Sequence, residues 1–405
     1  MKTLKKIILA ITLSLLAFVM MLSCKDKFAD LSFEQKINEF EYLYEVLEEN
    51  CPYLDVAGTE FNIHWLEKKK EYLNRIKNAP TDSAYLSVLS SILNETGSGH
   101  IGMAPMFSWK DYYEIYKKGA LEKPVYKTWV DVLKSVQPQS EYWQEVSKKV
   151  FPYYYDYVSE SAEVEFESVT TKIIIEKENK IAVIRIKSFW RSYLEKDSVL
   201  VNDFIEKIAD CNHLIIDIQD NGGGAVKLWK EHIVGRLIEE DITVSYYDAI
   251  KKGEHNELFY PDILAKQGMP KENFPNLPPE FLSDNVLIDE IKDTVVSINP
   301  VPFEGQVYLL INENIYSQSE RFTNFCNLSD WAITAGCEVV RDGTSSSEPI
   351  LLKLPESGIL ITYPSTVSLN PDGSYASKII SQLSVEGTHP DERLDNLIEY
   401  IKTNP

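Results

Sequence analysis

An apolar run followed by three consecutive glycines constrains the fold of this chain most strongly. Residues 214–218 are apolar except for Asp217, which predicts a buried strand. The hexapeptide 219–224, QDNGGG, follows, and a helical pattern then runs over 225–239. This order of strand, glycine turn and helix favours a βαβ-type sheet.

The glycine turn itself has two interpretations. Three glycines let backbone amides approach a ligand closely, as an oxyanion hole requires, but they also suit a tight corner between a strand and a helix. The pattern matches neither G-x-G-x-x-G nor G-x-x-x-x-G-K-[ST], so it gives a nucleotide site little support.

Residues 33–405 divide into three parts. Amphipathic spacing predicts a helical module over 33–103, and residues 104–165 predict a mostly helical connector. Alternating strands and helices predict an α/β core over 166–405, interrupted by an excursion at 251–302 that is rich in Pro and Asn. The core strands are expected at 172–176, 181–186, 214–218, 306–311, 331–335, 350–354 and 358–363, with helices at 193–208, 225–239, 318–328 and 394–402.

The first residues predict export. Three lysines precede an apolar run over 7–22, which is shorter than the ~20 residues that span a bilayer. Residues 21–24, MLSC, resemble a bacterial lipobox, so 1–23 is expected to be a lipoprotein signal peptide, Cys24 the lipidated N-terminus and 24–32 a tether. This places the chain on the outer membrane, periplasmic or surface-exposed. An ordinary secretory signal is the alternative.

Composition restricts the partners. A net charge of −21 over 405 residues argues against nucleic acid and against an anionic membrane surface as general partners. The other cysteines lack the paired spacings of a zinc site, and in a chain of this size they are expected to be packed thiols. They are Cys51, Cys211, Cys326 and Cys337. Neither a metal nor another cofactor is expected.

Two residues have the chemistry of a hydrolytic site. Ser317 lies in a turn between the expected strand 306–311 and the helix 318–328. There a hydroxyl faces unpaired amides that can stabilise an oxyanion, although Ser is also a common N-cap. His100 lies in the glycine-rich loop 96–102, and its ordinary pKa suits a general base.

Six segments together resemble the tail-specific, or carboxy-terminal-processing, serine peptidase family. In chain order they are GSGH at 97–100, LIIDIQDNGGG at 214–224, YSQSE at 316–320, Gly336, LPESG at 354–358, and the stretch from Val385 to Asp391. The resemblance implies a crotonase- or ClpP-like α/β spiral core behind the helical module.

The resemblance also implies roles for individual residues. The family nucleophile falls on Ser317, and the oxyanion amides fall on Gln318 and Gly223. The branch similar to the tricorn protease core uses a loop histidine and a late glutamate, which are His100 and Glu386 here. His100 would take the serine proton, and Glu386 would stabilise the imidazolium directly or through another group.

Departures from the family pattern accompany these matches. The processing branch places a lysine base 25 residues after the nucleophile, but position 317 + 25 = 342 is Asp342. Ser98 stands where an acidic residue usually precedes the loop histidine, and the segment 336–344 replaces the usual G-x-x-T-x-G. Residues 104–165 lack the pattern of the PDZ-like domain common in that branch.

These observations predict an exported serine peptidase that acts on peptides or unfolded protein segments. The alternative is a noncatalytic peptide-binding lipoprotein that keeps the scaffold, motivated by the altered segment 336–344. The oligomeric state is left open by the sequence.

Overall fold

The computed structural model describes residues 30–104, 109–153, 167–176, 179–344 and 347–404. The expected signal peptide, the expected lipidation site Cys24 and most of the expected tether lie outside the described residues. No helix in the described ranges is both long and apolar enough to cross a bilayer.

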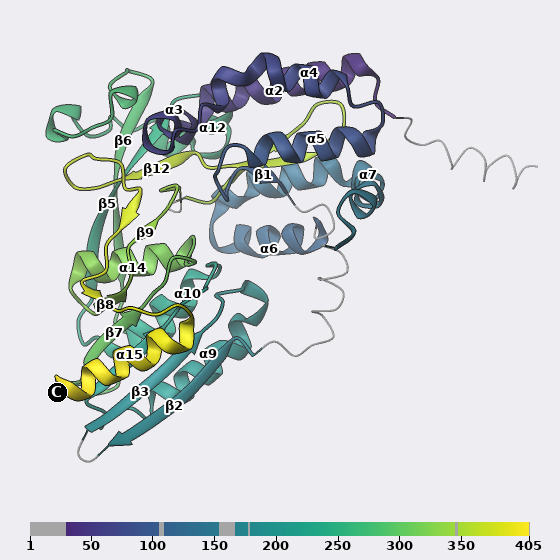
Figure 1. The fold of residues 1–405 in the computed structure, drawn as a ribbon. Coiled ribbons are helices and arrows are strands. Elements are labelled where there is room, and N and C mark those ends of the chain that lie inside the picture. The colour runs from purple at the N-terminus through teal and green to yellow at the C-terminus, as the bar shows by residue number, and fades with distance from the viewer. Residues whose placement is uncertain (1–29, 105–108, 154–166, 177–178, 345–346, 405) are drawn as a thin grey trace, which may run out of the picture.

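Helices form the upper part of the molecule in Figure 1. Side-chain caps stabilise the first turns of two of these helices. Ser32 and Gln35 form a reciprocal capping box at one, and at the other the Thr81 side chain accepts from the Ala84 N–H at 3.2 Å. These helices bury their apolar faces together in one core. They are α2 (Phe33–Asn50), α3 (Pro52–Phe61), α4 (Lys69–Lys77), α5 (Asp82–Asn94), α6 (Trp109–Glu122) and α7 (Lys127–Val150), with short 3₁₀ turns at Trp65–Lys68 and Pro124–Tyr126.

A six-stranded sheet forms the other part, in the order β14-β8-β7-β4-β3-β2. Only the outer hairpin β2–β3 is antiparallel, as expected where helices connect the inner strands. Separate apolar cores cover its two faces. The strands are β2 (Val169–Glu176), β3 (Asn179–Ile186), β4 (His213–Asp217), β7 (Gln306–Leu310), β8 (Ile333–Gly336) and β14 (Leu383–Ser384).

Helices pack against both faces of this sheet. They are α9 (Leu194–Ile205), α10 (Val226–Trp229), the π-helical turn Lys230–Val234, α11 (Gly235–Leu237), α14 (Gln318–Ser329) and α15 (Pro390–Thr403). The predicted combination of an N-terminal helical region and an α/β core is therefore confirmed.

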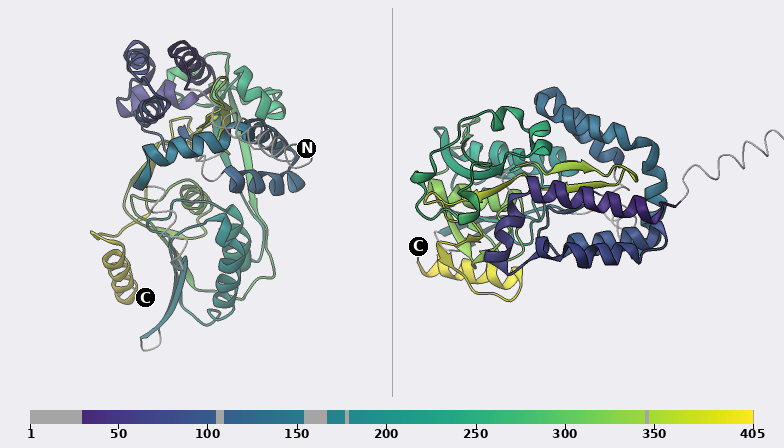
Figure 2. Two further views of the ribbon diagram at one scale, coloured as in Figure 1. Left: turned by 90° about the vertical axis from the view of Figure 1, so that its right-hand side faces the viewer. Right: turned by 90° about the horizontal axis from the view of Figure 1, so that it is seen from above.

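A long antiparallel hairpin links the two parts. Strand β5 (Ile242–Lys251) pairs over its whole length with β6 (Val286–Val295), and β12 (Thr366–Leu369) pairs on the other side of β5. Val244 and Val295 lie in a core of the six-stranded sheet, whereas Ala249 and Val286 lie in the helical core. In the left-hand view of Figure 2 the hairpin extends from the helical part toward the six-stranded sheet.

The expected excursion at 251–302 is therefore partly wrong. It contains β6 as well as the short helices α12 (Glu254–Phe259) and α13 (Pro261–Leu264) and 3₁₀ turns at Lys271–Asn273 and Pro279–Phe281. The charged second half of β6 hides the strand pattern, because only residues 286–289 and Val295 are buried.

A third sheet positions the histidine loop. Strand β1 (Gly102–Met103) pairs with β11 (Leu360–Tyr363), which pairs with β10 (Ile350–Lys353). Both β10 and β11 contribute to the helical core although they come late in the chain. A two-stranded ladder of β9 (Val339–Val340) and β13 (Lys378–Ile379) completes the strands of the described ranges.

The four cysteines expected to be thiols are free. Cys51, Cys211 and Cys326 are buried, whereas Cys337 is half-buried.

Candidate active site

Ser317 has an unusual backbone conformation at the start of α14. Its φ is 55° and its ψ is −116°, a combination that non-glycine residues rarely adopt. Its side chain makes no capping hydrogen bond to the helix. An ordinary serine N-cap has extended backbone and accepts an amide hydrogen, so the N-cap interpretation of Ser317 does not describe this geometry.

The glycine turn after β4 packs directly against Ser317. A Cβ atom on Gly223 would lie 2.8 Å from the Ser317 Cβ and 2.7 Å from the Gln318 nitrogen. Gly223 also has a φ of 90°. No other residue type fits here without displacing the serine turn.

The Asn221 side chain forms hydrogen bonds to both the glycine turn and the serine turn. Its Oδ1 accepts from the Gly223 N–H and from the Ser319 hydroxyl, each at 2.9 Å, and its Nδ2 donates to the carbonyl of Ile186 at 2.9 Å. Ser319 is fully buried and donates to Asn221, so its hydroxyl is not available as a nucleophile.

The two predicted oxyanion donors differ in whether they already donate to an acceptor in the structure. The Gln318 N–H begins the helix and has no acceptor among the described backbone groups. The Gly223 N–H already donates to Asn221, so it would have to leave that acceptor to bind an oxyanion.

His100 lies two residues before β1 and stacks on Tyr316, the residue before Ser317. The ring centroids are 4.7 Å apart with an angle of 27° between the planes. Gly99 permits this approach, since a Cβ there would lie 2.7 Å from the Tyr316 hydroxyl. The third sheet and the end of β7 thus bring the predicted base next to the predicted nucleophile turn.

Buried Asp342 lies behind the imidazole. It does not touch His100; two hydroxyls stand between them. The Tyr316 hydroxyl is 2.8 Å from His100 Nδ1 and 2.9 Å from Asp342 Oδ2. The Thr344 hydroxyl is 2.7 Å from His100 Nδ1 and 2.7 Å from Asp342 Oδ1.

The histidine loop holds Asp342 from the other side. The Ser98 hydroxyl donates to Asp342 Oδ2 at 2.6 Å, and the Gly99 N–H donates to the same oxygen at 3.2 Å. Ser98 Oγ in turn accepts from the backbone N–H of His100 at 3.2 Å.

No hydrogen bond joins Ser317 and His100 within the described part of the chain, although their turns are in contact. Catalytic hydrogen bonds are often long in a ligand-free enzyme. Burial lowers the pKa of His100 below its usual value, while the negative charges of Asp342 and Glu348 oppose this shift. A lowered pKa favours the neutral imidazole, which is the form that a general base needs.

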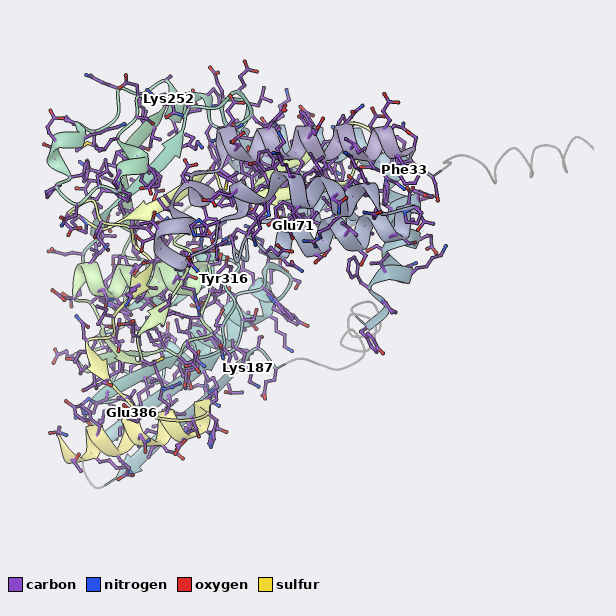
Figure 3. The ribbon with its side chains drawn as sticks, turned by 45° about the horizontal axis from the view of Figure 1, so that its top comes forward. Phe33, Glu71, Lys187, Lys252, Tyr316 and Glu386 are labelled. Atoms are coloured by element: carbon purple, nitrogen blue, oxygen red, sulfur yellow. The ribbon has the colours of Figure 1, made fainter. Side chains whose placement is uncertain are left out.

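The structure does not bring Glu386 to His100. Glu386 is exposed beside α15, and its backbone carbonyl accepts from Asn396 at 2.9 Å. Figure 3 shows Glu386 near the C-terminal helix, away from Tyr316. The predicted stabilisation of the imidazolium by Glu386 has no support in this geometry.

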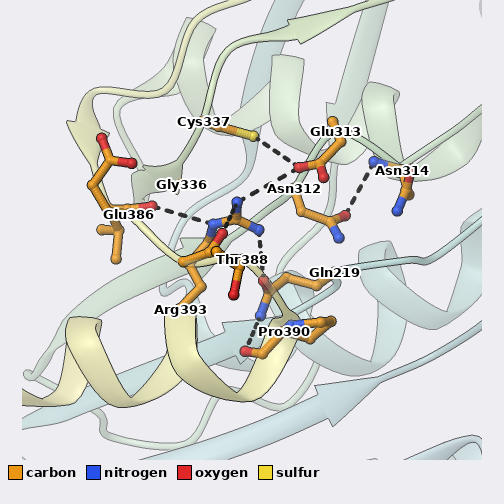
Figure 4. A network of polar contacts seen from close by, with 12 residues as sticks. Gln219, Asn312, Glu313, Asn314, Gly336, Cys337, Glu386, Thr388, Pro390 and Arg393 are labelled. Atoms are coloured by element: carbon orange, nitrogen blue, oxygen red, sulfur yellow. Dashed lines mark hydrogen bonds and ion pairs between the residues drawn. The ribbon is translucent and has the colours of Figure 1, made fainter.

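The segment around Glu386 has a structural role instead. Buried Arg393 donates to the carbonyl of Val385 at 3.2 Å, to that of Gly387 at 2.8 Å and to Gln219 Oε1 at 3.1 Å. Figure 4 shows this cluster, with the Glu386 carboxylate pointing away from Arg393. These bonds attach α15 to the end of β4.

Among the described residues, no group of three or more His, Cys, Asp or Glu side chains could hold a metal ion.

The sequence model of peptidase family S41 matches residues 180–393, which is more than half of the chain. The chain belongs to peptidase family S41. The match contains Gly223, Ser317 and Asp342, whereas His100 precedes it.

Solved structures share the fold of this S41 peptidase. One is described as a peptidase from Parabacteroides merdae; it is 17% identical, covers 90% of this chain and 95% of its own, and has a TM-score of 0.53. Mature CPAF in complex with lactacystin is 11% identical, with coverages of 92% and 97% and a TM-score of 0.57. No curated protein matches the chain.

Sequence reasoning assigned no role to Asp342, Tyr316, Thr344 or Asn221. One signal was available: Asp342 stands 25 residues after Ser317, where the processing branch is expected to have its lysine.

Proposed function

We propose that this S41 family member is a serine peptidase that hydrolyses peptides or unfolded protein segments through an acyl-enzyme. The observation that carries the proposal is the backbone of Ser317. Its φ is positive, and its hydroxyl makes no capping bond. The next residue, Gln318, has an N–H without an acceptor among the described backbone groups. His100 stacks on Tyr316, the residue before Ser317. Sharp, strained turns that expose a nucleophilic serine also occur in other hydrolases.

Each group has a role in this proposal. Ser317 Oγ attacks the peptide carbonyl carbon while His100 takes its proton, and the Gln318 N–H stabilises the oxyanion. The imidazolium then gives the proton to the leaving amine as the C–N bond breaks. Water, activated by the same imidazole, hydrolyses the acyl-enzyme.

Labelling with a fluorophosphonate tests the nucleophile. The wild-type chain and Ser319→Ala should be labelled, whereas Ser317→Ala and His100→Ala should not be. The same four proteins should be tested on an unfolded protein such as reduced casein. The wild type and Ser319→Ala should hydrolyse it, whereas Ser317→Ala and His100→Ala should not. A folded wild-type chain that binds peptide but takes no label would instead support the noncatalytic alternative.

We also propose that Cys24 carries a lipid that anchors the peptidase to the outer membrane, with its peptide substrates in the periplasm or outside the cell. The MLSC sequence at 21–24 supports this proposal. Metabolic labelling with a palmitate analogue should mark the wild type and not Cys24→Ser. Label on Cys24→Ser, or a wild type that stays in the soluble fraction, would contradict it.

A further inference from the structure

The hydroxyls of Tyr316 and Thr344 form two parallel bridges between Asp342 and His100. Each hydroxyl oxygen lies within 2.9 Å of a carboxylate oxygen and within 2.8 Å of the same ring nitrogen, Nδ1. A hydroxyl has one proton to donate. Whether each hydroxyl donates to Asp342 or to His100 therefore depends on which of these two residues can only accept.

Backbone donors establish that Asp342 is an acceptor. The Gly99 N–H donates to Oδ2 at 3.2 Å, and the Thr344 N–H donates to Oδ1 at 3.3 Å. These donors cannot reverse, and the Ser98 hydroxyl adds a third at 2.6 Å. Both carboxylate oxygens therefore accept, which is the pattern of an ionised carboxylate.

The proton count then determines the state of the imidazole. Tyr316 and Thr344 both give their single proton to Asp342, so both oxygens turn lone pairs toward Nδ1. A neutral imidazole carries one N–H, and only Nδ1–H satisfies both lone pairs. Nε2 is then unprotonated and can accept the Ser317 proton. The raised pKa of Tyr316, caused by burial and then by Asp342, keeps its hydroxyl protonated.

We propose that Asp342 is the positioning residue of the active site: through Tyr316 and Thr344 it holds His100 as the Nδ1–H tautomer and stabilises the imidazolium. The inference rests on the proposed function. During attack the Ser317 proton moves to Nε2 as the Oγ–C bond forms, and later it leaves with the amine as the C–N bond breaks. The Nδ1 proton stays in place, and no proton passes to Asp342.

In this proposal the altered segment after Gly336 supplies the residues that orient His100. Asp342 stands where the processing branch places its lysine base, so a residue that would remove the serine proton is replaced by one that orients a histidine. The same segment supplies Thr344. Tyr375 supports it by donating to the backbone carbonyl of Asp342.

Asp342→Asn tests the proton count directly. An asparagine amide must donate with its Nδ2, so at least one hydroxyl reverses and presents its proton to Nδ1, which favours the Nε2–H tautomer. Two-bond ¹H–¹⁵N NMR correlations of His100 distinguish the tautomers without any substrate. We expect Nδ1–H in the wild type and Nε2–H in Asp342→Asn, with kcat/KM reduced by up to about 10⁴-fold, because an Asp→Asn change that leaves the wrong histidine tautomer costs a serine protease about 10⁴ in kcat.

Further variants distinguish the loss of the hydroxyl bridges from misfolding of Asp342→Asn. Tyr316→Phe and Thr344→Val each leave one bridge and should reduce kcat/KM by about tenfold, whereas the double variant should approach the loss in Asp342→Asn. Asp395→Asn, on the exposed face of α15, is the control and should match the wild type.

Two results would overturn the inference: an Nε2–H tautomer in the wild type, or a folded Asp342→Asn or double variant with the tautomer and kcat/KM of the wild type. Failure of the proposed function looks different: Ser317→Ala and His100→Ala would then retain hydrolysis, or the folded wild type would take no fluorophosphonate label, while the tautomer measurement stays unaffected.

Discussion

The backbone N–H of Tyr316 donates to the carbonyl oxygen of Asn221 across 3.0 Å, which ties the serine turn to the glycine turn after β4. The Asn221 side chain adds bonds to Gly223, Ser319 and Ile186, and no part of it is exposed. A single buried asparagine thus fixes the position of the proposed nucleophile relative to the sheet.

Replacing Asn221 with alanine should therefore destabilise the fold as well as the site. Two donors, the Gly223 N–H and the Ser319 hydroxyl, would be left buried without an acceptor, at a cost of about 2–4 kcal/mol in the free energy of unfolding. Urea denaturation measures this difference. Asn273→Ala, at an exposed position, is the control; equal midpoints for the two variants would contradict the role given to Asn221.

Ser317→Gly and Ser317→Ala should differ in stability although both should be inactive. Glycine adopts positive φ without strain, whereas alanine keeps the strain of the serine, so we expect the glycine variant to be more stable by about 1 kcal/mol. Thermal unfolding at several denaturant concentrations compares them. An alanine variant at least as stable as the glycine variant would show that the turn is unstrained.

The pH dependence of kcat/KM should report His100. Its pKa is lowered by burial, and the neutral form is the active one, so the rate should rise with pH and level off, with a midpoint below 6.5. His64→Asn, which changes an exposed histidine, should leave this midpoint unchanged. In Asp342→Asn the residual activity should have a still lower midpoint, because a negative charge that raises the pKa of His100 is gone. A wild-type midpoint above 6.5 would contradict the burial argument.

Glu39 should make stability depend on pH. Burial raises the pKa of this α2 carboxyl to about 7, although the N–H and hydroxyl of Ser357 both donate to it. A raised carboxyl pKa means that the folded chain holds a proton that the unfolded chain has lost. Stability should therefore fall as pH rises from about 4.5 to about 7, by ~1–3 kcal/mol, and then level off.

Glu39→Gln should remove that slope and be more stable than the wild type at pH 8. Glu34→Gln, on the exposed start of the same helix, is the matched control and should keep the wild-type slope. Urea denaturation at pH 5 and pH 8 measures all three proteins. A wild type with equal stability at both values would argue that Glu39 is already ionised at pH 5.

Much of the fold follows from local patterns in the sequence. The apolar run at 214–218 and the amphipathic spacing near the C-terminus predict β4 and α15 to within a few residues. Such elements are predictable because their signals lie within one stretch of chain. Strand β6 was missed because its long pairing with β5 is made by residues 35 or more positions apart, and four of its own ten residues are charged.

In the candidate site, too, some features follow from the sequence and others only from the tertiary structure. The sequence by itself determined the residue types that chemistry requires, namely Ser317 after a strand and His100 in a glycine loop. Only the tertiary structure decided which acid faces the imidazole: exposed Glu386 is held beside α15, whereas Asp342 reaches His100 through two hydroxyls. The physical reason is that a hydrogen bond depends on distance and direction between side chains from separate strands and loops, and a sequence contains neither.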